Sequence, residues 1–258
     1  MKKLILRYLV LIIGHLLSMQ VISAQDQGVL VEFRFESSRY RNNESLIATA
    51  TQSKYVTSPI DSAIKTTSGN ITNKDIKSIQ IGSNIEKSEL YMTSTNNFGS
   101  IYYPTWQDVS IVIDSLPDIN WQIVSGSNKM IGPYNCEKAE AIFRGTEIVA
   151  YFAPEVPINF GPWKFKNLPG LILEVQVKNS PLGEHWYATK IVYPYIISES
   201  IALDKKDKKS MTFREYIVST EKKFTDKLTR AMSRLPAGVQ VTKSAGVRTA
   251  IEKKYEWE

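Results

Sequence analysis

The sequence has 258 residues, of which 22% are charged, and its formal charge is +6. This length allows one or two domains with a sizeable hydrophobic core, and so mild a charge gives no reason to expect a nucleic-acid partner. The single cysteine, Cys136, excludes an intramolecular disulfide, and two histidines are too few for a His-rich zinc site, so we expect no cofactor and no metal.

Residues 1–24 have the three parts of a secretory signal peptide. A basic start is followed by the apolar run of residues 8–17, and the small residues Ser23 and Ala24 precede Gln25. The run is shorter than the roughly 20 apolar residues of a membrane-spanning helix, so we expect cleavage after Ala24 and no stable transmembrane anchor. Removal of the three cations of this segment lowers the formal charge to +3. Residues 25–258 are then expected as a single β-rich domain, exported to the periplasm or the extracellular space.

Short strands separated by turns dominate the rest of the chain. Residues 29–37 alternate apolar and polar side chains, which is typical of a strand with one buried face. Residues 49–88 are rich in Thr, Ser, Asn and Lys, so loops with short hairpin strands or local disorder are expected there. A tight turn is predicted at Arg144 and Gly145. Further strands are predicted at residues 88–93, 101–106, 108–114, 119–126, 134–143, 146–154, 171–178 and 185–195.

A proline-rich segment, residues 154–170, precedes the predicted strand at residues 171–178. Its four prolines fix φ and push their neighbours towards extended geometry, so we expect a stiff crossing between two strands. Burial of an aromatic side chain there would contribute roughly 1.5–3 kcal/mol. We interpret the segment first as a corner that closes one end of the sheet, and second as a ligand or partner site. The candidate ligand-binding residues are Trp163, Phe165, Leu168, Pro169 and Glu155.

One helix is predicted towards the C-terminal side. Thr212 and Glu215 form a T-x-x-E capping box, and the apolar residues that follow recur on one stripe away from the Lys and Arg residues. We interpret this as a helix packed on the sheet with a solvated basic face. The predicted fold class is therefore mainly β (α+β): a curved antiparallel sheet, with a half-barrel as one form, and one C-terminal amphipathic helix.

A series of short motifs runs through residues 119–178. It contains NW at 120–121, KMIGPYNCEKA at 129–139, FRG at 143–145, AYFAPEVPI at 150–158, GPWKF at 161–165 and LPGLI at 168–172. This block resembles the GLPGLI family of exported proteins from the Bacteroidetes. Pro133, Thr146 and Asn167 depart from the family pattern of Gly, Arg and Gly, but Asn tolerates positive φ and should preserve the turn at Asn167. The family has no firmly established activity, so the resemblance implies export without a mechanism.

Three functions are compatible with these features. The first is a non-catalytic binding or accessory protein of the cell envelope, whose curved sheet would hold a lipid, a lipidated protein or a peptide, as in the similar carriers of the LolA type. Its partners would be outer-membrane or envelope proteins, or an apolar ligand. The second is a structural envelope protein whose surface mediates assembly only.

The third is a hydrolase that uses Cys136 or His185 together with an acidic group. This chemistry needs two of these groups within hydrogen-bonding reach. We expect Cys136 to be buried and unreactive, because a lone cysteine behaves as a small hydrophobic residue, so it is only a weak candidate for a reactive thiol. The acidic candidates are Asp114, Glu155 and Glu184.

Overall fold

The computed structural model describes residues 27–38, 40–58, 62–63, 87–102, 111–233 and 251–258. The predicted signal peptide lies outside the described residues, as does most of the predicted loop-rich stretch at residues 49–88. The described elements are β1 (Gln27–Glu36), β2 (Tyr40–Ala48), β3 (Gln52–Thr57), β4 (Ser62–Ala63), β5 (Ser88–Thr93), β6 (Phe98–Tyr102), β7 (Ile111–Ser115), β8 (Gln122–Ile131), β9 (Tyr134–Phe143), β10 (Thr146–Ala153), β11 (Leu171–Val177), β12 (His185–Ile196), β13 (Ser210–Thr212) and α2 (Phe213–Met232).

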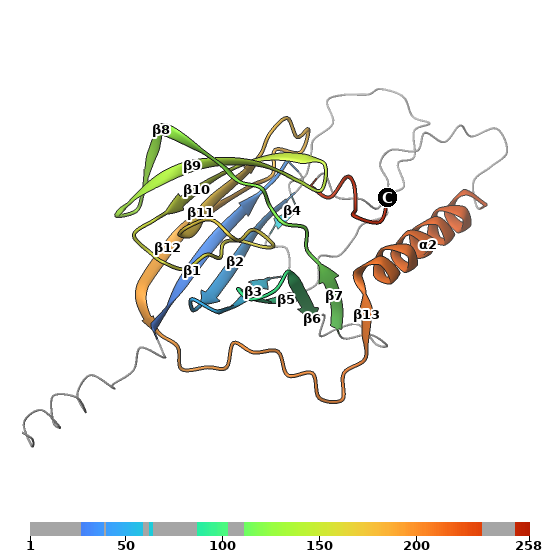
Figure 1. Cartoon of the computed structure of the whole chain (residues 1–258). Helices are drawn as coiled ribbons and strands as arrows, with labels where there is room; N and C mark the ends of the chain where they lie inside the picture. Colours follow the sequence, from blue (N-terminus) through green and yellow to red (C-terminus); the bar gives the residue numbers. More distant parts are fainter. Residues whose placement is uncertain (1–26, 39, 59–61, 64–86, 103–110, 234–250) are drawn as a thin grey trace, which may run out of the picture.

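The strands form one open sheet (Figure 1). Their order is β13-β7-β6-β5-β3-β2-β1-β12-β11-β10-β9-β8, and β4 pairs with β2 off this path. Only the pairing of β13 with β7 is parallel among the pairings of the described strands. Over the described residues, the prediction of a mainly antiparallel β fold with one helix on its C-terminal side is confirmed.

The sheet is strongly curved. Asp114 lies on β7 and Arg144 in the turn between β9 and β10, eight strand spacings away from β7 in the sheet order, which is roughly 38 Å in a flat sheet. Arg144 Nη2 nevertheless donates to Asp114 Oδ1 at 2.7 Å. The two halves of the sheet therefore bend towards each other, and the side chains between them form two clusters of buried hydrophobic residues.

Some predicted strand boundaries were wrong. The strand predicted at residues 119–126 begins later and extends to Ile131, because β8 resumes its pairing with β9 after an irregularity between Val124 and Lys129. The strand predicted at residues 101–106 is β6, which begins at Phe98 opposite β5 and β7. The tight turn at Arg144 and Gly145 is confirmed, and both residues have the positive φ angles, 44° and 77°, that a two-residue hairpin turn of type I′ requires.

The predicted capping box begins α2. Glu215 N donates to Thr212 Oγ1 at 3.2 Å, and Thr212 N donates to Glu215 Oε2 at 2.8 Å. Phe213, in the first turn of the helix, is buried in the core, and α2 contacts β7 and β13. Beyond this first turn the helix leads away from the sheet, and Lys222 and Lys223 are exposed (Figure 1). Within the described ranges, no helix has the length and apolar character to cross a membrane.

Candidate functional site

The proline-rich segment, residues 154–170, connects β10 to β11, and we call it the corner. It folds back along the start of β11, where Leu171 N donates to Val156 O at 3.1 Å and Ile172 N donates to Phe160 O at 3.0 Å. Asn167 has a φ of 71°, so the prediction that Asn preserves a positive-φ turn at this position is confirmed. The corner is therefore an ordered structure built against the sheet.

Two glycines of the corner allow this close approach. A Cβ atom on Gly161 would lie 2.5 Å from the Cβ of Ile172, and a Cβ atom on Gly170 would lie 2.3 Å from the carbonyl oxygen of Ala153. Both distances are shorter than real Cβ contacts, and the second is to rigid backbone. Glycine is thus required at positions 161 and 170, because the corner packs closely on β10 and β11 there.

The aromatic residues of the corner pack as predicted. Phe165 is 0% exposed and Leu168 is 1% exposed. Trp163 is half-buried, with its ring stacked on Trp186 at 6.0 Å between centroids and in edge contact with Phe143 and Phe165. Glu155 and Pro169, the remaining candidate ligand-binding residues, are exposed. Trp163 also has a φ of 51°, an unusual conformation for a bulky side chain and one found often at functional sites.

Two cations from the sequence motifs are buried beside the corner. The side chain of Arg144 is 0% exposed and that of Lys164 is 2% exposed. Arg144 contacts Asp114 through both of its terminal nitrogens, at 2.7 and 3.1 Å, and Lys164 Nζ lies 2.7 Å from Asp114 Oδ2. Although burial acts to raise it, the charges of Lys164 and Arg144 hold the pKa of Asp114 below its ordinary value. Asp114 is therefore ionised, and it supplies one negative charge for two positive ones.

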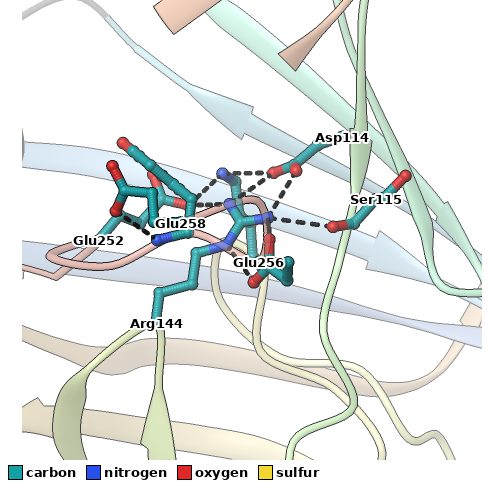
Figure 2. A network of polar contacts seen from close by, with 8 residues as sticks. Asp114, Ser115, Arg144, Glu252, Glu256 and Glu258 are labelled. Carbon is teal, nitrogen blue, oxygen red and sulfur yellow. Dashed lines mark hydrogen bonds and ion pairs between the residues drawn. The ribbon is translucent and has the colours of Figure 1, made fainter. Parts of the chain in front are cut away.

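The second part of the negative charge comes from residues 251–258, which we call the docked segment. Arg144 bonds to Glu252, and its Nη2 lies 3.0 Å from Glu256 Oε2, while Lys164 Nζ lies 2.6 Å from Glu252 Oε1. Figure 2 shows Arg144 extending between Asp114 on one ribbon and these glutamates on another. The resulting network joins β7, the β9–β10 turn, the corner and the docked segment.

The docked segment lies directly across the β9–β10 turn. The backbone N–H groups of Lys253 and Lys254 both donate to Arg144 O at 3.0 Å. A Cβ atom on Gly145 would lie 3.2 Å from the Cβ of Lys254, so the absence of a side chain at Gly145 lets the docked segment lie close to the turn. Tyr255 is 3% exposed and makes an edge contact with Phe213 at 5.7 Å between ring centroids.

A buried carboxyl group lies on β2, on the core side of the sheet. Glu44 Oε2 accepts a hydrogen bond from Trp186 Nε1 at 2.9 Å and one from the Tyr55 hydroxyl, and Asn42 Nδ2 donates to Glu44 Oε1 at 3.4 Å. Burial raises the pKa of Glu44 to about 7, against the lowering effect of these three donors. Glu44 therefore fixes the indole of Trp186, and the ring of Trp163 in the corner stacks on that indole.

We expect Glu44 to make stability depend on pH. The folded chain holds this proton up to about pH 7 and the unfolded chain loses it near pH 4.5, so the folded state is favoured at low pH and loses that advantage as the pH rises through 7. The loss is on the order of 3 kcal/mol. Glu44→Gln keeps the acceptor oxygen but cannot ionise. Urea unfolding from pH 5 to pH 8 should show wild-type stability falling relative to Glu44→Gln, and parallel curves would contradict the prediction.

The hydrolase candidates do not form a reactive pair. Cys136 is 0% exposed, and burial, together with the charges of Glu155 and Glu174, raises the pKa of its thiol to about 11. His185 Nε2 lies 3.1 Å from Glu174 Oε1, which is not among the acids expected for it. Asp114 binds the buried cations instead, and the buried Glu184 accepts a hydrogen bond from Ser180.

We therefore expect Cys136 to react slowly in the folded protein. A thiol with a pKa of about 11 is almost fully protonated at neutral pH, and the thiolate is the nucleophile. A small thiol reagent should label the native chain far more slowly than the chain unfolded in denaturant at the same pH. Comparable labelling rates in the two states would show that the thiol is accessible and activated.

Comparison with known families identifies the same part of the chain. Residues 140–174 match a family model described as "Protein of unknown function (Porph_ging)". These residues include the β9–β10 turn, the whole corner and the start of β11, and the predicted resemblance to the GLPGLI family is confirmed over this short segment. No curated protein matches the chain.

The chain matches solved structures at low sequence identity. Two structures of PNGF-II, in space groups C2 and P21, have TM-scores of 0.49 and 0.51 at 16% and 13% identity, and the matches cover 74% and 75% of this chain. The chain spans about a third of PNGF-II, with 32% and 33% of that chain covered. The Pseudomonas aeruginosa MucA/MucB complex matches at 8% identity with a TM-score of 0.38, over 69% of this chain and 56% of that one. At 13% identity and a TM-score of 0.51, the match to the P21 form of PNGF-II indicates a shared fold alone.

Proposed function

We propose that this protein is a non-catalytic exported binding protein of the cell envelope, and that Arg144 and Lys164 bind a carboxylate of its partner. One observation carries the proposal: among the described residues, Asp114 is the one carboxylate that the sheet contributes to these two buried cations, and a separate chain segment supplies the others. A buried cation is costly unless it is paired. The pair of cations is therefore a preformed receptor for negative charge.

The geometry suits a carboxylate better than an apolar chain. The guanidinium of Arg144 presents a planar pair of donors, which matches the two oxygens of a carboxylate, and Lys164 adds a point charge beside it. Both residues are held by rigid structure, one in a two-residue hairpin turn and the other in the glycine-anchored corner. Among the ligands considered for an envelope binding protein, a peptide or protein partner fits this site better than a lipid tail.

The binding proposal is favoured over the hydrolase. A raised thiol pKa and full burial oppose a nucleophilic Cys136, whereas the β9–β10 turn and the corner each supply one buried cation for binding. Export rests on the signal peptide expected at residues 1–24, and the partner is accordingly expected in the envelope.

The proposal is tested by cross-linking the full-length protein in its native envelope. Wild type, Lys164→Gln and the control Lys178→Gln are compared, because Lys178 also pairs with a glutamate, Glu140, but at the surface. We expect the same cross-linked partner with wild type and the control, and its loss with Lys164→Gln in a variant that melts cooperatively. Equal recovery from all three chains, or hydrolysis that depends on Cys136, would contradict the proposal.

A further inference from the structure

We infer that the docked segment is a built-in occupant of the Arg144–Lys164 site, and that the partner is a peptide segment of the same acidic and aromatic pattern that takes its place. This inference rests on the proposed function and names the class of its partner. Four features of the docked segment lead to it: its mode of attachment, the bare turn beneath it, the aromatic groups around Arg144, and its charge.

The docked segment is attached like a bound peptide. None of its residues belongs to a strand or a helix. Its backbone hydrogen bonds to the β9–β10 turn end on a single acceptor, the carbonyl oxygen of Arg144. Its side chains add further contacts, and Ile251, Glu252 and Tyr255 are buried whereas Lys253 and Lys254 are exposed. A buried set and an exposed set of side chains on one short segment are also what a bound peptide presents to its receptor.

The receptor surface is shaped for such a segment. Gly145 has no side chain where the segment crosses, and a Cβ atom there would crowd Lys254 at 3.2 Å. Gly145 also has a φ of 77°, so glycine serves both the turn and the crossing. The two requirements coincide in the FRG motif, which is also part of the matched family segment at residues 140–174. The motif therefore forms a surface over which a peptide backbone can pass closely.

An acidic group alone would not complete the site. The guanidinium carbon of Arg144 lies 5.4 Å from the ring centroid of Tyr255 and 5.1 Å from that of Phe213. Tyr255 in turn stacks on Trp257 at 4.6 Å between centroids. Arg144 is thus bound at its nitrogens by carboxylates and over its face by an aromatic ring of the docked segment, a combination that excludes water from the charge. The partner is expected to carry a glutamate followed three residues later by an aromatic residue.

A covalently attached occupant must be displaced before a partner can bind. Such a segment acts at an effective concentration on the order of millimolar, so a separate peptide competes poorly with it. Weakening the attached segment without changing the receptor should therefore strengthen the binding of a separate peptide by the same factor. This reciprocity separates a peptide site from a merely structural ion-pair network.

The test uses the full chain and a fluorescent peptide with the sequence of residues 251–258. Tyr255→Ala loosens the attached segment and leaves all of its charges in place, and Glu256→Gln is a milder second variant at an exposed position. Glu32→Gln, at an exposed pair with Lys190, is the matched control. A second peptide, with Gln in place of the residue equivalent to Glu252, reports on the carboxylate. Cooperative melting verifies that each chain is folded.

We expect the peptide to bind wild type and Glu32→Gln weakly, and to bind Tyr255→Ala at least about tenfold more tightly, because the competitor is weakened. Glu256→Gln should show a smaller gain, and the Gln-containing peptide should not bind. Equal affinity for all chains, no binding to any chain, or equal binding of the two peptides would overturn the inference. If the peptide fails but the Lys164-dependent envelope partner is still recovered, only the peptide class is wrong. If the peptide does not bind and the envelope partner is not recovered either, the proposed function is contradicted as well.

Discussion

Replacing Arg144 by Ala is expected to lower the free energy of unfolding by about 3–5 kcal/mol, the cost of removing one partner from a buried ion pair. The side chain is fully buried and bonds to Asp114, Glu252 and Glu256. Without it, Asp114 and Glu252 keep their contacts with Lys164, and Glu256 loses its contact with Arg144. The change also removes the link between β7 and the β9–β10 turn, so the loss should appear in urea unfolding as a lower midpoint.

Two further variants control for this result. Lys178→Ala removes a surface cation that pairs with Glu140, and it should cost less than about 1 kcal/mol. Arg144→Lys keeps the charge but cannot form two parallel bonds with Asp114, so its stability should lie between those of wild type and Arg144→Ala. A loss for Arg144→Ala no larger than that for Lys178→Ala would show that the network does not connect the two halves of the sheet.

The second large effect is expected for Trp163→Ala, which should lower the free energy of unfolding by about 3–5 kcal/mol. The indole ring stacks on Trp186 and meets Phe143 and Phe165 edge-on, and it lies 4.8 Å from Lys164 Nζ. Its removal leaves a cavity beside these three rings and exposes one side of the buried ammonium group of Lys164. A typical domain has only about 5–15 kcal/mol of stability, so the variant should melt much earlier than wild type.

This variant also separates a structural corner from an exposed binding surface. Phe98→Ala, at a ring that is 52% exposed, is the control and should change stability by less than about 0.5 kcal/mol. If Trp163→Ala melts within a degree or two of wild type and loses the envelope partner, the ring serves binding and not packing. A chain that is fully stable and still retains the partner would contradict both interpretations of the corner.

Strands with regular alternation, such as β1, could be predicted from the sequence, whereas β2 could not. β1 buries Val29, Val31 and Phe33, so its pattern is visible locally. β2 was missed because two of its core-facing positions are Asn42 and Glu44. These side chains are tolerated because their partners come from distant segments, such as Trp186, 142 residues away from Glu44. No local pattern contains that information.

The candidate site was predicted only in part. The packing of the corner followed from its prolines and aromatic residues, and the tight turn followed from Arg144 and Gly145. Asp114 was considered as an acid for catalysis, whereas it binds the two buried cations. The docked segment was missed because Glu252 lies 108 residues from Arg144 and 88 from Lys164. The one available signal was a pair of cations, Arg144 and Lys164, within otherwise apolar motifs, which predicts buried ion pairs without naming their partners.

The central claim is that the docked segment occupies a peptide site and can leave it while the sheet stays folded. Amide hydrogen exchange, followed by NMR on the isotope-labelled full chain with unlabelled peptide of the same sequence as residues 251–258, measures this directly. We predict that excess peptide speeds exchange at Lys253 and Lys254, whose N–H groups donate to Arg144 O, while β10 and β11 remain protected. Unchanged exchange at these two amides under saturating peptide, or their exchange only together with the whole sheet, would contradict the account.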